Sequence, residues 1–170
     1  TTSPGGAVAG LFVRTELERN VAKAPAGYTA DIRGALGLTV KLTDTQVGTL
    51  YDGAGQTNCF KAIPGAGVVL NGTRTLEKIN PDKFIPVRRT LNYVKFQVKE
   101  LSARSLFEPN NVQTWNNLTA NISSFLYNFW KQGGLKGARA QDAFFVVCNS
   151  SNNTPSSIDQ GIVNVSIGVA

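Results

Sequence analysis

The 170-residue chain contains no histidine and no methionine, and it has only two cysteines. Without histidine, neither a Ser-His-Asp triad nor a Cys-His pair can form, and histidine-ligated metal sites are excluded. Cys59 and Cys148 are too few for a zinc cage, and their apolar or loop surroundings predict two buried free thiols. Because even the initiator methionine is missing, we expect a processed or excised piece of a longer chain.

Other kinds of catalytic and binding chemistry are also missing. The eleven acidic residues are scattered, and the nearest two, Glu16 and Glu18, would point to different sides of a helix. The glycine-rich stretches DGAGQT and IPGAGV lack the lysine and hydroxyl residue of a phosphate loop, and they lack a dinucleotide fingerprint. We therefore predict that the chain is not an enzyme and has no catalytic residue, cofactor or metal. No apolar run is long enough to cross a membrane, so no direct membrane contact is expected.

Positive charge is concentrated in one segment of a chain whose net charge is +6 at pH 7. Residues 83–139 hold nine lysines and arginines but only two acidic residues, Glu100 and Glu108, so the segment carries +7 and the rest of the chain −1. Such a segment is expected to meet an acidic partner. One interpretation is a nucleic-acid-binding module that uses residues 83–139, with an affinity that falls steeply with salt.

The first part of the sequence predicts short helices and strands. Apolar residues recur at helical spacing over residues 4–19, and residues 42–51 are expected to form a second short helix. Residues 59–76 contain two strand-like stretches around the turn sequence IPGAG. Because the character of the sequence changes near Asn80-Pro81, we place a boundary there. The two predicted regions are residues 1–80 and 81–170.

Two long amphipathic helices are predicted in the second region. One is expected over about 20 residues from Pro86, with apolar side chains at alternating steps of four and three. Its stripe comprises Val87, Leu91, Val94, Val98 and Leu101. The other runs from about residue 111 to 132 and ends at Gly133-Gly134, since glycine adopts the left-handed conformation at least cost. Its inner face comprises Val112, Trp115, Leu118, Ile122, Phe125, Leu126 and Phe129.

The last 30 or so residues have the character of strands. DAFFVVCN is a continuous apolar run, which is typical of a strand that is covered on both faces. Residues 161–170 alternate between apolar and small or polar side chains, which predicts a half-buried strand. Its apolar face comprises Val163, Val165, Ile167 and Val169. The predicted fold class is α+β, with a mixed sheet packed against two long antiparallel helices.

The stretch FLYNFWKQGGLKGAR, residues 125–139, changes from aromatic to cationic. Phe125 and Phe129 lie one helical turn apart and are predicted to be core residues. Tyr127 and Trp130 point elsewhere, which leaves both the core and a partner-binding surface open for them. Three cations follow without an acidic residue among them. They are Lys131, Lys136 and Arg139.

In this order, the segments resemble the contractile tail sheath proteins of myophages, R-type bacteriocins and related extracellular injection particles. The stretches that carry the resemblance extend over roughly residues 4–169. They are SPGGAVAGLFVRTELERNVAKAPAG, FKAIPGAGVVLNGTRTL, VRRTLNYV, FEPNN, TWNNLTANISSFLYNFWKQGGLKGA, AFFVVCNSSNNT and IDQGIVNVSIGVA. The sequence departs from the family at Ala66, Pro86 and Asn149, where the family commonly has Arg, Asn and Asp.

The resemblance implies a structural subunit of a contractile tail sheath, which polymerises around the tail tube and contracts to drive it through the target cell envelope. Residues 1–80 would be the C-terminal part of a larger, subtilisin-like α/β domain, and residues 81–170 the inner, tube-facing domain without its terminal arm. The implied partners are other sheath subunits in a six-fold helical homopolymer, the tail tube protein, and baseplate and tail terminator proteins, but no nucleic acid. The implied location is the virion tail sheath, assembled in the bacterial host cytoplasm.

The resemblance also implies two sets of site residues. Lys131, Lys136 and Arg139 are expected to contact an acidic surface of the tube. The final strand is expected to accept an added strand from the arm of a neighbouring subunit, since an unprotected edge would otherwise invite aggregation. The residues of this edge are Val163, Val165, Ile167 and Val169.

Overall fold

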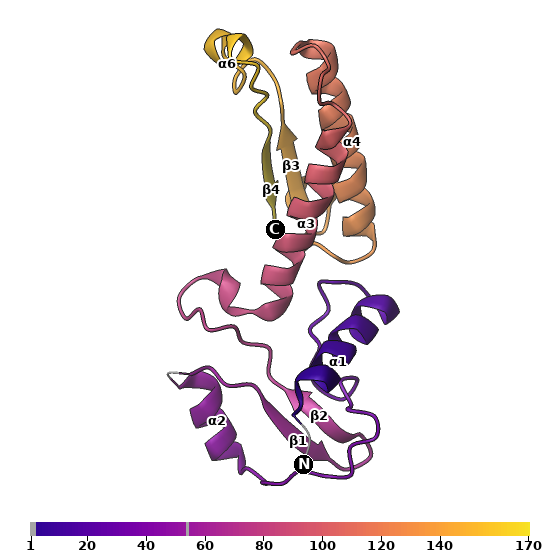
Figure 1. The fold of residues 1–170 in the computed structure, drawn as a ribbon, viewed down its shortest axis with the longest axis vertical. Coiled ribbons are helices and arrows are strands. Elements are labelled where there is room, and N and C mark those ends of the chain that lie inside the picture. Colours follow the sequence, from indigo (N-terminus) through magenta and orange to yellow (C-terminus); the bar gives the residue numbers. More distant parts are fainter. Residues whose placement is uncertain (1–2, 54) are drawn as a thin grey trace. The chain divides into compact units, whose positions relative to one another are not determined.

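The computed structural model describes residues 3–53 and 55–170, and the chain forms two compact units, Thr1–Leu91 and Asn92–Ala170. Within the described residues, helices accompany two separate two-stranded antiparallel sheets, which confirms the α+β class (Figure 1). The prediction of one mixed sheet is wrong, because each strand pairs with a partner that runs back along it and no parallel pair is formed in this part of the chain.

The first unit is built on a hairpin of β1 (Cys59–Ile63) and β2 (Gly67–Asn71), which confirms the two strands predicted around IPGAG. Gly65 and Gly67 in the turn have φ angles of 81° and 76°, in the left-handed region that favours glycine. The segment around Ala30 pairs with the other side of β2, where the Leu70 N–H donates to the Ala30 carbonyl at 3.0 Å. A short strand-like segment therefore lies beside β2, on the edge that does not pair with β1.

Two predicted helices complete the first unit. Helix α1 (Gly5–Glu18) packs on the hairpin through Leu11, which is buried with Ala30 and Leu70. Helix α2 (Asp44–Asp52) begins at a capping box in which the Thr43 hydroxyl accepts from the backbone N–H of Gln46. A single 3-10 turn, η1 (Pro81–Lys83), follows the hairpin. Helices α1 and α2 confirm the two short helices predicted over residues 4–19 and 42–51.

Helix α3 (Ile85–Ala103) begins in the first unit and continues into the second. In the second unit it packs against α4 (Val112–Lys131), where the Tyr93 ring lies 5.9 Å from Phe125 and 5.3 Å from Phe129, centroid to centroid. Helix α4 buries most of the face that its periodicity predicted, but Val112 in its first turn is 61% exposed and Phe125 is only half-buried. The buried members are Trp115, Leu118, Ile122, Leu126 and Phe129.

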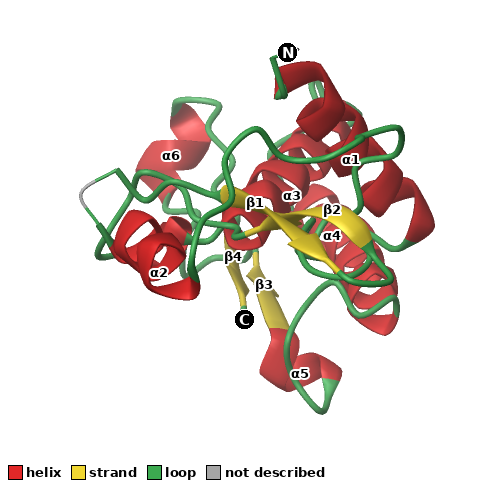
Figure 2. Ribbon diagram, turned by 90° about the horizontal axis from the view of Figure 1, so that it is seen from below, coloured by secondary structure: helices red, strands yellow, loops and turns green. Residues whose placement is uncertain are grey.

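The second sheet pairs β3 (Phe144–Val147) with β4 (Ser166–Val169) and runs alongside the long helices (Figure 1). Helix α5 (Ala140–Ala143) leads directly into β3 (Figure 2). The prediction that both faces of this strand are covered is wrong, because Phe145 is 58% exposed. Its ring lies on Gly168, its partner across the sheet, where an added Cβ would overlap the ring.

The final strand is shorter than residues 161–170, and the reason is a buried asparagine. Asn153 is 2% exposed, its side-chain amide donates to the Asn164 carbonyl at 3.1 Å, and its oxygen accepts from the Asn164 N–H at 2.6 Å. A side chain thus takes the backbone groups that a strand partner would otherwise bind. Val163 and Val165 therefore precede β4, which corrects the predicted strand. The intervening loop also contains α6 (Pro155–Asp159), capped by Thr154.

We expect Leu126→Ala to lower the free energy of unfolding by about 2–5 kcal/mol, because it removes a fully buried side chain and leaves a cavity. Urea unfolding of the full chain, followed by circular dichroism, measures the change. Val112→Ala on the same helix serves as the control and should cost less than about 0.5 kcal/mol. Equal losses from both variants would contradict the assignment of the buried face.

We expect Asn153→Ala to cost about 1–3 kcal/mol, because it removes a buried side chain that binds both the N–H and the carbonyl of Asn164. Hydrogen exchange at the Asn164 amide should speed up more than exchange at α4 amides. The exposed Asn121 provides the matched control, and Asn121→Ala should leave both quantities unchanged. Unchanged exchange at Asn164 in the first variant would show that this side chain does not hold the segment.

Candidate assembly surfaces

A tight glycine turn ends α4 and directs the segment that carries the three cations. The N–H of Gly133 donates to the Trp130 carbonyl at 2.8 Å, and the N–H of Gly134 donates to the Phe129 carbonyl at 3.0 Å. Gly133 has a φ of 76°, and a Cβ on Gly134 would overlap the Phe129 ring. Both glycines are therefore needed for the chain to pass close over the helix end. We call residues 131–139 the cationic tip.

The three predicted contact residues of the cationic tip are all exposed, but they differ in their surroundings. Lys131 places its Nζ 5.1 Å from the centre of the Tyr127 ring, a cation–π distance. Arg139 forms a bidentate ion pair with Asp142 at 3.0 and 3.1 Å. Lys136 and Lys131 have no ion pair within the described residues. Because Asp142 balances Arg139, the two lysines supply most of the net positive charge of the tip.

The two aromatic residues whose place the sequence left open both contribute to the cationic tip. Tyr127 and Trp130 lie 5.6 Å apart, ring centre to ring centre, and Tyr127 remains partly exposed. The indole N–H of Trp130 donates to the Gly137 carbonyl at 3.0 Å. Trp130 therefore fixes the path of the tip, while Tyr127 offers a ring to the surface beside Lys131.

The chain's last residue, Ala170, lies next to the cationic tip. The Lys136 N–H donates to the Ala170 carbonyl at 3.0 Å, and the Ala170 N–H donates to the Ala143 carbonyl at 2.9 Å. The cations and the end of β4 are therefore neighbours in the second unit. Sequence spacing alone did not indicate this, because the hydrogen bond from Lys136 joins residues 34 positions apart.

The β4 edge is the second candidate surface. In the described chain β4 pairs with β3 alone, so the opposite edge carries no strand. The four predicted edge residues are all half-buried, and Asn164 and Ser166 between them are exposed, so the alternation over 163–167 is confirmed even where β4 has not begun. Val163 and Val165 lie outside the strand, and Ile167 and Val169 lie within it. Asn153 was not predicted from the sequence, because its side chain binds the backbone of Asn164, eleven positions away.

The basic segment 83–139 is partly neutralised by acidic side chains. Arg88 pairs with Asp82 at 3.2 Å, and Arg89 pairs with Glu16 while its guanidinium lies over the Phe12 ring. Arg139 pairs with Asp142, as described above. Three of the nine cations thus have acidic partners. Among the described residues, Lys95 and Lys99 are exposed on α3 without an ion pair, and the exposed Arg104 follows the helix. The +7 counted along the segment therefore overstates the charge that it presents to a phosphate backbone.

The described residues contain no group of three or more His, Cys, Asp or Glu side chains placed to hold a metal ion. Both cysteines are free and buried, as the sequence predicted. Burial raises the pKa of the Cys148 thiol, and a hydrogen bond from the Asn153 amide opposes this only in part. The thiol is therefore protonated at neutral pH and a poor nucleophile. Among the described helices, none combines the length and apolar character that crossing a membrane requires.

Comparisons of sequence point to one family. Residues 77–170 match the model of the phage tail sheath C-terminal domain. The chain is 32% identical over 90% of its length to a tail sheath protein of Enterobacteria phage T4. It is 30% identical over 96% of its length to a tail sheath protein of Vibrio phage KVP40 (isolate Vibrio parahaemolyticus/Japan/Matsuzaki/1991). The chain spans only 22% and 24% of the length of these two relatives.

Solved structures agree with this result. The sheath complex of an extracellular contractile injection system, PVC, in its contracted state is 36% identical, with a TM-score of 0.89 over 95% of this chain and 45% of that one. The contracted helical sheath of the anti-feeding prophage (AFP) is 31% identical, with a TM-score of 0.88 over 98% of this chain and 46% of that one. A chain of the six-fold symmetrised AFP baseplate is 32% identical, with a TM-score of 0.91 and the same coverage. The chain belongs to the phage tail sheath family, and its residues 77–170 match the C-terminal domain of that family.

Proposed function

We propose that the chain is part of the structural subunit of a contractile tail sheath. The subunit polymerises around a tail tube, and rearrangement of the polymer drives the tube through the target cell envelope without nucleotide or catalysis. The observation that carries this proposal is the agreement of 95–98% of the chain with sheath and baseplate chains of contractile systems, at TM-scores of 0.88 to 0.91.

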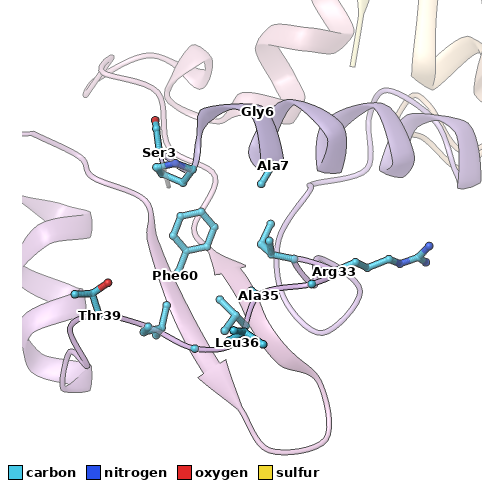
Figure 3. A pocket seen from close by; sticks show the side chains of 14 residues that line it. Ser3, Gly6, Ala7, Arg33, Ala35, Leu36, Thr39 and Phe60 are labelled. Atoms are coloured by element: carbon cyan, nitrogen blue, oxygen red, sulfur yellow. The ribbon is translucent and has the colours of Figure 1, made fainter. Parts of the chain in front are cut away.

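The domain assignment is supported by an apolar groove in the first unit. The groove has a volume of about 750 Å³ and lies between α1, β1 and residues 32–39. Figure 3 shows Phe60 and Ala7 at this groove, with Leu36 on the opposite side. The groove is open and is lined mainly by apolar and small residues, which a further part of the domain can cover. We assign residues 1–80 to the C-terminal part of a larger, subtilisin-like α/β domain that covers it, and residues 81–170 to the inner, tube-facing domain.

The free edge of β4 supports contact with neighbouring subunits. Its outward backbone groups are available to an added strand, and its half-buried face gives that strand a fixed register. We assign this contact to an arm of a neighbouring copy in a six-fold helical homopolymer, the symmetry of the similar baseplate chain. The edge residues are Val163, Val165, Ile167 and Val169.

The cationic tip supports contact with an acidic tube surface through Lys131, Lys136 and Arg139. Exposed ion pairs contribute only about 0–1 kcal/mol each, so a single subunit would hold the tube weakly. In a ring of subunits the small free energies of these ion pairs add up. Each pair can still break when the sheath contracts. Since Arg139 is already paired with Asp142, we expect the two lysines to contribute more.

The remaining partners follow from the place of a sheath in its particle. Baseplate proteins would contact one end of the polymer and tail terminator proteins the other. The match to an AFP baseplate chain supports the first of these contacts. The location is then the virion tail sheath, assembled in the bacterial host cytoplasm, with no nucleic-acid or direct membrane contact.

Negative-stain electron microscopy of the full-length protein, alone and with its tube protein, tests the proposed function. We expect hollow cylinders. The competing interpretation, a nucleic-acid-binding module that uses residues 83–139, predicts monodisperse protein that shifts duplex DNA and loses affinity steeply with salt. Observation of that behaviour, without cylinders under any condition, would overturn the proposal.

The double variant Lys131→Glu/Lys136→Glu should lose most of its co-assembly with tube protein, because two attractive charges become repulsive. Pelleting of tube with sheath measures the effect, and raising the salt should weaken the wild-type contact in the same direction. Lys95→Glu/Lys99→Glu on the exposed face of α3 is the control with the same charge change, and it should co-assemble as the wild type does. Normal co-assembly of the first variant would show that the tip does not hold the tube.

A further inference from the structure

Phe107, in the loop after α3, combines two unfavourable features. Its φ angle is 73°, in the left-handed region that a bulky residue rarely adopts, and its side chain is 103% exposed. Leu106 beside it is also largely exposed. Neither the backbone nor the packing of the second unit therefore benefits from a phenylalanine at this position. Strain of this kind, held at a surface, points to a contact that the isolated chain does not show.

A groove opens next to this ring. It has a volume of about 470 Å³ and lies between residues 102–110, the first turns of α4 and residues 161–165. Its apolar lining comprises Leu106, Phe107, Leu118, Val163 and Val165. Leu118 is buried, so it forms the floor, while Leu106 and Phe107 stand exposed on one wall. Glu108 is the one ionisable residue among the lining residues. The groove therefore suits an apolar side chain rather than a charged surface.

The groove is continuous with the β4 edge. Val163 and Val165, on the opposite wall, are the residues that lead into β4. A strand added along β4 would, if it continued past Ser166, run over the groove and present side chains to it at every second residue. An acidic tube surface does not fit this lining, because the cations that it would need lie at the cationic tip, beside the other end of β4.

We propose that this groove is a docking site for an apolar side chain from an extended segment of a second copy of the chain, with Phe107 as the anchor. The inference rests on the proposed function, in which copies lie side by side. The ring is exposed at the groove before the copies meet, so no contact within its own unit has to break when the second copy binds. Because the groove and the docked segment are different parts of the same chain, the contact is head-to-tail and can repeat along a helical polymer.

Phe107→Asn in the full-length protein tests the proposal, because asparagine tolerates the left-handed conformation but removes the ring. We expect the unassembled subunit to be at least as stable as the wild type. The protein concentration needed to form cylinders should rise about tenfold or more, the factor that loss of a buried Phe gives. Phe96→Asn is the matched control, because Phe96 is 59% exposed on α3 and does not line the groove. It should change that concentration by less than about twofold.

The possible outcomes distinguish a failure of the docking site from a failure of the proposed function. If wild-type protein forms cylinders and Phe107→Asn forms them at the same concentration, the docking site is wrong and the sheath function stands. If wild-type protein forms none under any condition, the proposed function fails. A less stable subunit in Phe107→Asn, or equal effects of both variants on assembly, would also overturn the docking site.

A photo-crosslink identifies the occupant. Phe107→p-benzoylphenylalanine, irradiated in assembled cylinders that contain tube protein, should give an adduct of two sheath copies, with the second attachment point in one extended segment. An adduct with tube protein, or no adduct in intact cylinders, would contradict the assignment.

Discussion

Ile122 and Leu126 are fully buried on one face of α4, and the second unit depends on the packing of that face. Burial of such side chains contributes roughly 1.5–3 kcal/mol each, more than any exposed ion pair in the chain. The same helix positions both candidate surfaces. Its end directs the cationic tip over Phe129, and its inner face packs alongside the sheet whose edge is free. A rigid helix with a packed face thus carries surfaces that contribute little to the stability of the unit itself.

The two candidate surfaces differ in their physical chemistry, which fits two different tasks. The cationic tip offers screened, individually weak charges, which suit a contact that must be made in many copies and then released. The β4 edge offers backbone hydrogen bonds beside apolar side chains, which suit a contact that persists while subunits move. The proposed docking groove at Phe107 would extend the second surface. In the proposed function, contraction breaks the first kind of contact while the second kind remains.

Much of the local structure was predictable, because helical periodicity and turn residues act over a few positions. The apolar spacing correctly predicted both long helices, and Gly133-Gly134 correctly predicted where α4 ends. The failures involve contacts between distant residues. Asn153 takes the backbone groups of Asn164, eleven positions away, and so shortens β4, which no local pattern reveals. Likewise, the apolar run around Phe145 predicted a covered strand, but a two-stranded hairpin leaves that ring exposed.

The candidate site was predictable only in part for the same reason. The sequence identified the cations of the tip, but the ion pair of Arg139 with Asp142 and the link from Lys136 to Ala170 depend on the folded turn. The central claim is that this chain works by contact with its own copies. A cryo-electron microscopy reconstruction of the assembled full-length protein tests it most directly. The account predicts additional strands from neighbouring subunits paired along the edge of β4. A β3–β4 sheet that remains two-stranded and exposed to solvent in the assembled particle would contradict it.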